Sequence, residues 1–461
     1  MSRERFKENT LKTLAQIAAE LEGYDPQALS ADDVLRFLSK LVSPVQETSD
    51  MPLFEALGRV LSDDVISPFD VPPHDNSAMD GYAFDGLQLT DTPLSLKVVG
   101  TAFAGKAWQG TVTAGQCVKI TTGAIMPTGL DTVVPQELVS ANDDSITIPA
   151  KVLKPGDNRR HRGEDLMQGK PALLKGELLT PARLGLAASL GLKTVRCYRQ
   201  LKVAYFSTGD EILSLGEPPR EGAVYDSNRY TVFGLLTRMG CQVIDMGVVR
   251  DDPALLEEAF IQAAAQADAI ITSGGVSVGE ADHTKSMMKK LGDVEFWRIA
   301  MRPGRPMAVG RIEKPVLEPF LGAKSTPSPM DICVSSYESY SNSNGCILFG
   351  LPGNPVAVMV TFLAFVRPAL LQMMGADAAP EPLLKARSQE AMRKKPGRTE
   401  YQRGWVSTAA DGTLQVKTTG NQGSGVLSSM AQANGLIVLH HGQGNVAEGE
   451  AVDVLMFDGA I

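Results

Sequence analysis

Residues 201–375 contain short, continuous apolar runs separated by helical patterns, and this alternation restricts the fold more than any other feature of the sequence. The runs LKVAYFSTG, CQVIDMGVV and DAIITSGG have the length and composition of strands that are buried on both faces. Between them, residues 228–239 show a helical apolar face, and Asp252-Pro253 is a capping residue followed by proline at the first helical position. This alternation predicts a doubly wound α/β domain with a parallel-rich sheet.

The rest of the chain divides by composition into four further parts. A polar, amphipathic start predicts two helices, the second capped by Ser30 with Asp33 and running to about Leu41, and its simplest interpretation is a pendant extension without a catalytic part. Short alternating runs rich in Gly, Pro, Thr and Val predict β structure. The expected domains are residues 1–45 (N-terminal helical extension), 46–66 with 166–197 (helical linking domain), 67–165 (inserted β domain), 198–377 (α/β domain, with a Ser/Pro/Asn-rich surface insert at about 313–345) and 378–461 (C-terminal β domain).

Charge and cysteine content exclude several classes of protein. The formal net charge of -9 argues against binding to nucleic acid or to an anionic membrane. Five cysteines, an odd number without a CxxC pair, argue against a disulfide framework and a cysteine-rich zinc site. The charged N-terminus is not a secretory signal, and no run of 18 apolar residues predicts a transmembrane helix. We therefore expect a cytoplasmic protein.

Polar loops follow four of the predicted strands, and in an open α/β sheet the carboxyl ends of the strands form the ligand site. The loops are residues 208–211, 250–252, 274–282 and 351–355. Glycines at 274, 275 and 279 let backbone N–H groups approach an anion. The acidic side chains suggest a hydrated Mg²⁺ between protein and phosphate, and three arginines suit a phosphate or an oxyanion such as molybdate. Those arginines are Arg298, Arg302 and Arg305.

Each of these features also has a simpler interpretation. Asp252 alone is most simply a helix cap, the glycine pair a tight turn, and the arginines solvated side chains. Two polar runs outside the sheet, residues 75–83 and 158–165, have no clear strand or helix period, and the second could be a solvated charged turn. The histidines lack the spacing of metal ligands. Taken together, the four loops predict a ligand site but identify no family.

The family signal comes from eight motifs in a fixed order. They are DNSAMDGYA, TTGAIMP, RRHRGED, FSTGDE, RDDP, SGGVSVGEADHT, MRPGRP and GLPGNPVA. In this order and spacing they resemble the bacterial molybdopterin molybdotransferase family of the MoeA type, whose eukaryotic relatives include the gephyrin E domain. The resemblance runs from about residue 46 to the C-terminus and omits the N-terminal helices and the insert at 313–345.

The resemblance implies an elongated homodimer of four-domain subunits, with a three-layer α/β domain related to molybdopterin adenylyltransferase. It implies that the chain takes adenylylated molybdopterin, uses Mg²⁺ and molybdate, cleaves the pyrophosphate, releases AMP and leaves molybdenum on the dithiolene. The resemblance also implies that Asp80, which lies far along the chain from the sheet loops, meets the sheet loops of the partner subunit. Further partners that the resemblance suggests are molybdopterin adenylyltransferase and molybdoenzyme chaperones.

The family's functional positions map onto this chain motif by motif. The implied catalytic acids are Asp80, Glu211, Asp251 and Asp282, of which the last three are the Mg²⁺ ligands. The resemblance implies that Thr122 and Asp165 are substrate-binding positions and that Ser277, Arg302, Arg305, Pro306, Arg403 and Ser424 bind molybdate. The sheet loops and the arginine run add Gly274, Gly275, Arg298 and Asn354 as candidate substrate-binding residues.

The chain departs from the family pattern at two places. Relatives often have lysine where Arg298, Arg302 and Arg305 stand, and commonly have serine where this chain has Ala357. Two alternative functions stay open at this point: the preceding adenylyltransferase step, because the α/β domain is shared, and a non-catalytic scaffold of the gephyrin type.

Overall fold

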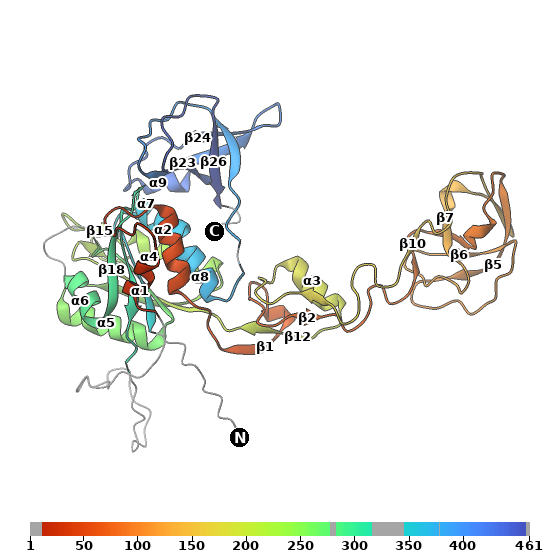
Figure 1. The fold of residues 1–461 in the computed structure, drawn as a ribbon, viewed down its shortest axis with the longest axis horizontal. Coiled ribbons are helices and arrows are strands. Elements are labelled where there is room, and N and C mark those ends of the chain that lie inside the picture. Colours follow the sequence, from red (N-terminus) through yellow and green to blue (C-terminus); the bar gives the residue numbers. More distant parts are fainter. Residues whose placement is uncertain (1–11, 277–282, 316–344, 378, 458–461) are drawn as a thin grey trace, which may run out of the picture.

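The protein is elongated in the computed structural model, which describes residues 12–276, 283–315, 345–377 and 379–457. The α/β domain and the C-terminal β domain lie together at one end (Figure 1). A slender linking region leads away from them, and the inserted β domain sits at the far end of the molecule.

A six-stranded sheet forms the centre of the α/β domain, in the order β16-β13-β17-β21-β20-β18. The first four of these strands are parallel, and β20 and β18 add an antiparallel edge. The predicted parallel-rich sheet is therefore confirmed. The strands are β13 (Lys202–Thr208), β16 (Gln242–Val249), β17 (Ala269–Ser273), β18 (Gly292–Arg298), β20 (Pro306–Ile312) and β21 (Cys346–Leu351), with a small parallel pair, β14 (Ile212–Leu213) and β15 (Val224–Tyr225), beside them.

Helices cover both faces of this sheet and make the three layers. Alternate side chains of β13 point to opposite faces, so that Phe206 packs towards α5 and α6, and Tyr205 packs towards α4 and α7. Every residue of β17 and β21 is buried, which is why their sequences read as unbroken apolar runs. The helices are α4 (Ser227–Arg238), α5 (Pro253–Gln266), α6 (His283–Leu291), α7 (Pro355–Thr361), the π-helical turn Phe362–Val366 and α8 (Arg367–Met373).

The run from α7 through α8 is long and apolar enough to cross a membrane, by length and composition alone. Two-thirds of this stretch, Pro355–Met373, is buried inside the protein. It packs against α2, α4 and β21. Its apolar composition is therefore explained by its place in the core of the α/β domain.

The N-terminal helices are part of the core of the α/β domain. The predicted cap is present, because the Asp33 N–H donates to Ser30 Oγ and the second helix, α2 (Ala31–Leu41), ends where expected. That helix and α1 (Leu14–Ala19) bury their apolar sides against β18, α8 and the π-helical turn. Phe37 stands edge-on to Trp297 of β18, with 4.9 Å between ring centroids. The interpretation as a pendant extension is wrong, because the apolar faces of both helices pack against distant segments of the α/β domain.

The linking domain contains less helix than the sequence suggested. A helix was expected within residues 46–66, but the chain there forms strand β1, a 3-10 turn and a short strand. Strand β1 pairs antiparallel with a strand 140 or more residues later, and no local pattern announces such a partner. The elements are β1 (Thr48–Pro52), the turn Leu53–Glu55, β2 (Val65–Ile66), β11 (Pro171–Leu173), α3 (Pro181–Ser189) and β12 (Thr194–Tyr198).

The inserted β domain is built on a second six-stranded sheet, in the order β7-β4-β6-β5-β9-β8. Apolar side chains are buried on both sides of it, Val118 and Val133 in one cluster and Cys117 and Val134 in another. The elements are β3 (Asn76–Ser77), β4 (Gly81–Phe84), β5 (Leu94–Ala102), β6 (Gln116–Ile120), β7 (Thr132–Pro135), β8 (Ser140–Asn142), β9 (Ser145–Ile148), β10 (Arg159–Arg160) and the 3-10 turns Gly86–Gln88 and Gln136–Leu138.

The C-terminal β domain is a small barrel that recruits a strand from the α/β domain. Its strands pair in the order β23-β24-β22-β26-β25, and a further pairing of β23 with β25 closes the sheet. Strand β19, which belongs to the α/β domain, adds to β23 in parallel. The elements are β19 (Met301–Arg302), β22 (Leu384–Ser388), β23 (Thr399–Thr408), β24 (Leu414–Thr418), α9 (Leu427–Ala431), β25 (Gly435–Leu439) and β26 (Ala451–Met456).

Replacing Phe37 by alanine tests whether the N-terminal helices belong to the core. Phe37 is fully buried, so Phe37→Ala should lower the free energy of unfolding by about 3–5 kcal/mol, measured by denaturant unfolding with tryptophan fluorescence. The control is Leu35→Ala in the same helix, where the side chain is already exposed. Equal, small effects of both substitutions would return the helices to the role of a pendant extension.

Candidate functional site

A cavity of about 600 Å³ opens between the α/β domain and the C-terminal barrel. One wall is the segment between β18 and β20, which we call the arginine loop (residues 298–306). The other walls come from the loop after β21 and from the C-terminal domain. The residues around it are Met301, Arg302, Pro303, Gly304, Arg305, Pro306, Pro352, Gly353, Asn354, Ala357, Arg398, Gln422, Gly423 and Ser424.

Backbone hydrogen bonds shape the arginine loop. The Ile299 N–H donates to the Arg305 carbonyl at 2.8 Å and closes the loop on itself. The Thr399 N–H donates to the Ala300 carbonyl at 2.8 Å, beside the β19–β23 pairing. Gly304 has a φ of +94° and a Cβ there would lie 2.5 Å from the Thr361 methyl, so only glycine fits at this turn.

Arg302 and Arg305 bring positive charge to the cavity without a carboxylate to neutralise it. Both side chains are exposed, and no ion pair joins either of them to another residue in the part of the chain that the structure describes. Arg398, a third cation on the wall, is paired with Glu400 at 2.7 Å. The cavity therefore carries two forked, unpaired donors that suit a tetrahedral anion.

Arg403 lies behind this wall and is buried, with 1% of its surface exposed. Its guanidinium donates to Ser429 Oγ at 3.0 Å and to the carbonyls of Asn421 and Gly423 at 3.2 and 2.9 Å. Burial, together with the charge of Arg302, lowers the pKa of Arg403 to about 10. These contacts hold the 421–424 loop, which contributes Gln422 and Ser424 to the cavity.

The sheet loops place two of the predicted acids at the carboxyl edge. Gly209 has a φ of +142°, and a Cβ there would lie 2.5 Å from the Glu211 carboxylate, so this side chain folds back over the strand end. Asp251 follows β16, and its Oδ1 accepts a hydrogen bond from Thr284 Oγ1 of α6 at 3.3 Å. Asp252 caps α5 through the N–H groups of Ala254 and Leu255, as its simpler interpretation predicted.

The glycine pair after β17 is required by packing. A Cβ at Gly274 would lie 2.3 Å from the Thr208 carbonyl oxygen, and a Cβ at Gly275 would lie 2.6 Å from Thr284. The Gly274 N–H donates to the Leu351 carbonyl at 3.2 Å, so this N–H already has a partner within the protein. The pair brings the 274–276 turn close to the loop after β21, where a Cβ built on Gly353 would lie 4.0 Å from the Gly274 Cα.

Two of the predicted residues, Ser277 and Asp282, lie outside the described residues. Within the described ranges, no three acidic, histidine or cysteine side chains come together as a metal site. The predicted Mg²⁺ set is therefore represented in the structure by Glu211 and Asp251.

Asp80 and Thr122 form a contact of their own in the inserted β domain. The Asp80 carboxylate accepts the Thr122 N–H at 2.6 Å and the Thr122 hydroxyl at 2.9 Å. These hydrogen bonds, the backbone one first, lower the pKa of Asp80, so the carboxylate keeps its charge. Asp165 lies at the base of the same domain, where its N–H donates to the Val71 carbonyl. Within one chain the inserted domain stands far from the sheet edge (Figure 1).

Most of the chain is similar to known proteins of one family. Three family models match: the MoeA N-terminal region (domains I and II) at residues 29–191, a probable molybdopterin-binding domain at 204–372 and the MoeA C-terminal region (domain IV) at 385–457. The molybdopterin molybdenumtransferase of Haemophilus influenzae is 41% identical over 92% of this chain and 97% of its own length. The chain belongs to the molybdopterin molybdenumtransferase family. It is a transferase of molybdenum cofactor biosynthesis, as the motifs predicted.

Other members of the family agree with this assignment. The molybdopterin molybdenumtransferase of a Nostoc species is 35% identical over 92% of both chains. The crystal structure of the molybdopterin biosynthesis moeA protein of Pyrococcus horikoshii superposes with a TM-score of 0.73 at 27% identity, covering 94% of this chain and all of that one. The match of the N-terminal model begins at residue 29, so α2 belongs to the family region. The expectation that the resemblance begins at about residue 46 is corrected accordingly.

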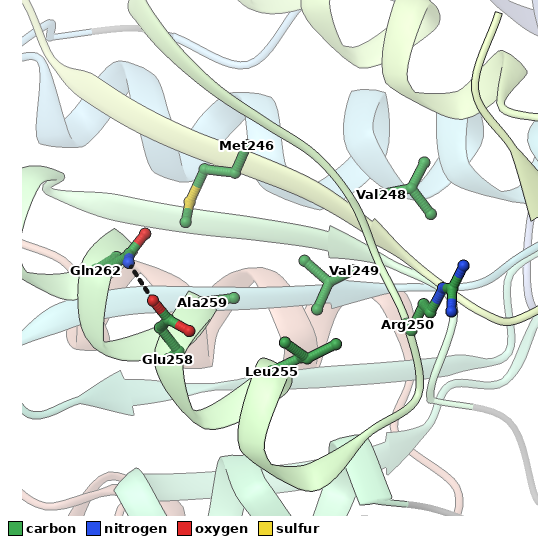
Figure 2. A pocket seen from close by; sticks show the side chains of 8 residues that line it. All are labelled: Met246, Val248, Val249, Arg250, Leu255, Glu258, Ala259 and Gln262. Carbon is green, nitrogen blue, oxygen red and sulfur yellow. Dashed lines mark hydrogen bonds between the residues drawn. The ribbon is translucent and has the colours of Figure 1, made fainter. Parts of the chain in front are cut away.

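A second cavity, of about 330 Å³, lies along β16 and α5 (Figure 2). Arg250 stands at one end, and at the other Gln262 donates to Glu258 at 2.9 Å. Apart from these, its lining is apolar or alanine, and it contains no residue that the motifs single out as functional.

The polar residues around the cavity differ from the predicted set, because Arg298 and Arg403 are not among them and Arg398 and Gln422 were not predicted. Arg298 is exposed at the end of β18 but is not among the residues around the cavity, whereas Arg302 and Arg305 are. Arg398 and Gln422 were missed, because they reach the cavity only through the pairing of β19 with β23 and the loop that Arg403 holds. No local pattern in the sequence signals that pairing.

The Asp80–Thr122 contact predicts a measurable titration shift. Because Thr122→Ala removes the hydroxyl that donates to the carboxylate, the pKa of Asp80 should rise towards its usual value, and protonation should occur at a higher pH. Carbon-detected NMR titration of the Asp80 carboxyl measures this shift. Thr122→Ser keeps the hydroxyl and should keep the low pKa; an unchanged pKa in Thr122→Ala would mean that the backbone N–H alone sets it.

Proposed function

We propose that this transferase inserts molybdate into adenylylated molybdopterin, with cleavage of the pyrophosphate and release of AMP. The observation that carries the proposal is the pair of unpaired arginines, Arg302 and Arg305, on a cavity of about 600 Å³. Unneutralised guanidinium groups in a partly enclosed cavity favour an anionic ligand. The family supplies the identity of that anion, because its members are named for molybdenum transfer.

The cavity offers molybdate hydrogen bonds from three directions. Arg302 and Arg305 supply forked donors, Ser424 supplies a hydroxyl, and Asn354 supplies a side-chain amide at the start of α7. Ala357, where relatives commonly have serine, also lines the cavity and supplies no donor. Arginine in place of lysine at 302 and 305 compensates in donor number, because each guanidinium carries five N–H groups.

The carboxyl edge of the sheet would hold the pyrophosphate end of the substrate. Glu211 and Asp251 offer hard oxygen ligands of the kind that Mg²⁺ takes, and the 274–276 turn offers close backbone approach. Bound Mg²⁺ would neutralise charge on the phosphates. Asp282 completes the acidic set proposed from the motifs and Ser277 the oxyanion set, although both lie outside the described residues. Gly275 remains the turn's candidate for an N–H to the substrate.

The inserted domain contributes Asp80, Thr122 and Asp165, and we propose that it does so across a homodimer. Its distance from the sheet edge within one chain supports this view (Figure 1). Two-fold symmetry would bring the inserted domain of each subunit to the sheet edge of its partner and create two equal sites. We further propose a cytoplasmic location, with molybdopterin adenylyltransferase and molybdoenzyme chaperones as the proteins that deliver the substrate and accept the product.

Two alternatives are less well supported. The adenylyltransferase reaction needs the α/β domain alone, whereas this chain spans 97% of a molybdenumtransferase. A pure scaffold would need neither the charged cavity nor the acids at the sheet edge. The deciding assay supplies adenylylated molybdopterin, Mg²⁺ and molybdate and measures the release of AMP and the formation of active cofactor. A rate of AMP release that does not depend on molybdate would overturn the proposal.

Replacing single arginines tests the cavity. Arg305→Ala removes charged hydrogen bonds, which are worth about 1.5–3 kcal/mol, and should raise the KM for molybdate roughly 10- to 100-fold, with a smaller change in kcat. Arg298→Ala is the matched control, because Arg298 is exposed on the same loop but is not among the residues around the cavity. Equal increases in KM for both variants would move the molybdate site away from this cavity.

Mixed dimers test the shared site. Homodimers of Asp80→Ala and of Asp251→Ala should both be inactive, and a dimer with one subunit of each should regain about half of the wild-type AMP release. One of its composite sites then carries both substitutions and the other carries neither. Co-expression with two tags and purification of the doubly tagged dimer give the species to measure. An inactive mixed dimer would place both acids in the site of one subunit.

A further inference from the structure

Residues 24–30 run beside the backbone that enters the arginine loop, and we call them the bracing segment. The Arg298 N–H donates to the Pro26 carbonyl at 2.8 Å, and the Ala300 N–H donates to the Leu29 carbonyl at 2.7 Å. Leu29 and Ile299 form a parallel β-bridge between these two bonds. The segment thus adds a short strand to one side of the loop's entry.

Side-chain contacts also join the bracing segment to the end of β18. The Trp297 indole N–H donates to the Tyr24 hydroxyl at 2.9 Å, and its ring stands edge-on to Phe37. Tyr24 in turn stacks on Phe37, with 5.9 Å between ring centroids. Trp297 is 2% exposed, so the residue that immediately precedes Arg298 is fixed by the N-terminal part of the chain.

The opposite side of the loop's entry is held by different partners. The Ile299 N–H is bound to the Arg305 carbonyl, and the Ala300 carbonyl is bound to the Thr399 N–H. Three consecutive residues, 298–300, are therefore clamped between the bracing segment on one side and the loop and C-terminal barrel on the other. The contacts on both sides of residues 298–300 therefore determine the direction of the backbone that continues into β19 and the cavity arginines.

This placement has consequences for binding because Arg302 and Arg305 have no carboxylate partner in the described part of the chain. Within the described residues, the backbone and the cavity walls then determine where the two guanidinium groups lie. A forked donor pair binds an oxyanion well only when its geometry is fixed beforehand.

We propose that the bracing segment is a positioning element for oxyanion binding: it holds the arginine loop so that Arg302 and Arg305 converge on one anion. The inference rests on the proposed function for the identity of the anion. Tyr24 and Pro26 precede residue 29, where the match to the family model begins, so this part of the brace lies outside the region that the family model describes.

Two leucine substitutions separate positioning from mere stabilisation. Leu29 and Leu14 are both buried in the same core, but Leu29 bridges to Ile299 at the end of β18, whereas the Leu14 N–H donates to Asp293 at the start of that strand. Leu29→Ala and Leu14→Ala should therefore lower the melting temperature of the full-length protein to similar degrees. Only Leu29→Ala should weaken the binding of inorganic molybdate, roughly tenfold, in equilibrium dialysis.

Hydrogen exchange of residues 298–306 supplies a second readout that needs no ligand. Exchange there should accelerate in Leu29→Ala and stay at the wild-type rate in Leu14→Ala. Equal molybdate dissociation constants in the two variants, or equal exchange, would overturn the inference. If the wild-type protein itself does not bind molybdate, the proposed function falls, and the exchange rates still decide whether the segment holds the loop.

Discussion

The parallel pairing of Met301 and Arg302 with Thr399 and Glu400 is the contact on which the candidate site depends. It joins the C-terminal barrel to the α/β domain by backbone hydrogen bonds. Two residues of this pairing, Met301 and Arg302, lie on the cavity wall, and Glu400 pairs with another wall residue, Arg398. The pairing places the barrel beside the arginine loop, so that residues of both domains line the same cavity.

The electrostatics of this region follow from its position between two domains. Four arginines approach one another here, and among the described residues only Arg398 has an acidic partner, Glu400. Burial and the charge of Arg302 lower the pKa of Arg403. Its guanidinium donates to backbone carbonyls instead of a carboxylate. Unneutralised cations beside a cavity cost stability, and such groups are commonly found at functional sites.

The candidate site residues are divided between the two ends of the molecule (Figure 1). Asp80 and Thr122 are rigidly joined to each other in the inserted domain, whereas Glu211 and Asp251 belong to the sheet edge. The Arg199 guanidinium binds the Asp268 carboxylate through two hydrogen bonds of 2.6 and 2.8 Å, where the linking region enters the α/β domain. Such a partly buried, bidentate pair fixes the direction of the linking region more firmly than a single surface contact would.

Much of the fold could be predicted because its signals are local. The buried strands β17 and β21 are apolar along their whole length, α4 and α5 carry visible caps and apolar faces, and the eight motifs identify the family. The acids at 211 and 251 could be placed at the sheet edge because parallel strands end at a common edge. For these elements the chemistry of a short stretch of sequence is sufficient.

The tertiary structure alone decided the contacts between distant segments. The partner of β1 is β12, the partners of the N-terminal helices are β18, α8 and the π-helical turn, and the partner of β19 is β23. None of these pairings has a local signature. They decided that residues 46–66 form a strand, that residues 12–45 belong to the core, and that Arg305 but not Arg298 meets the cavity. The physical reason is that an unpaired backbone N–H or C=O group, or an exposed apolar face, requires a partner. The local sequence does not specify that partner, which is determined only when the chain folds.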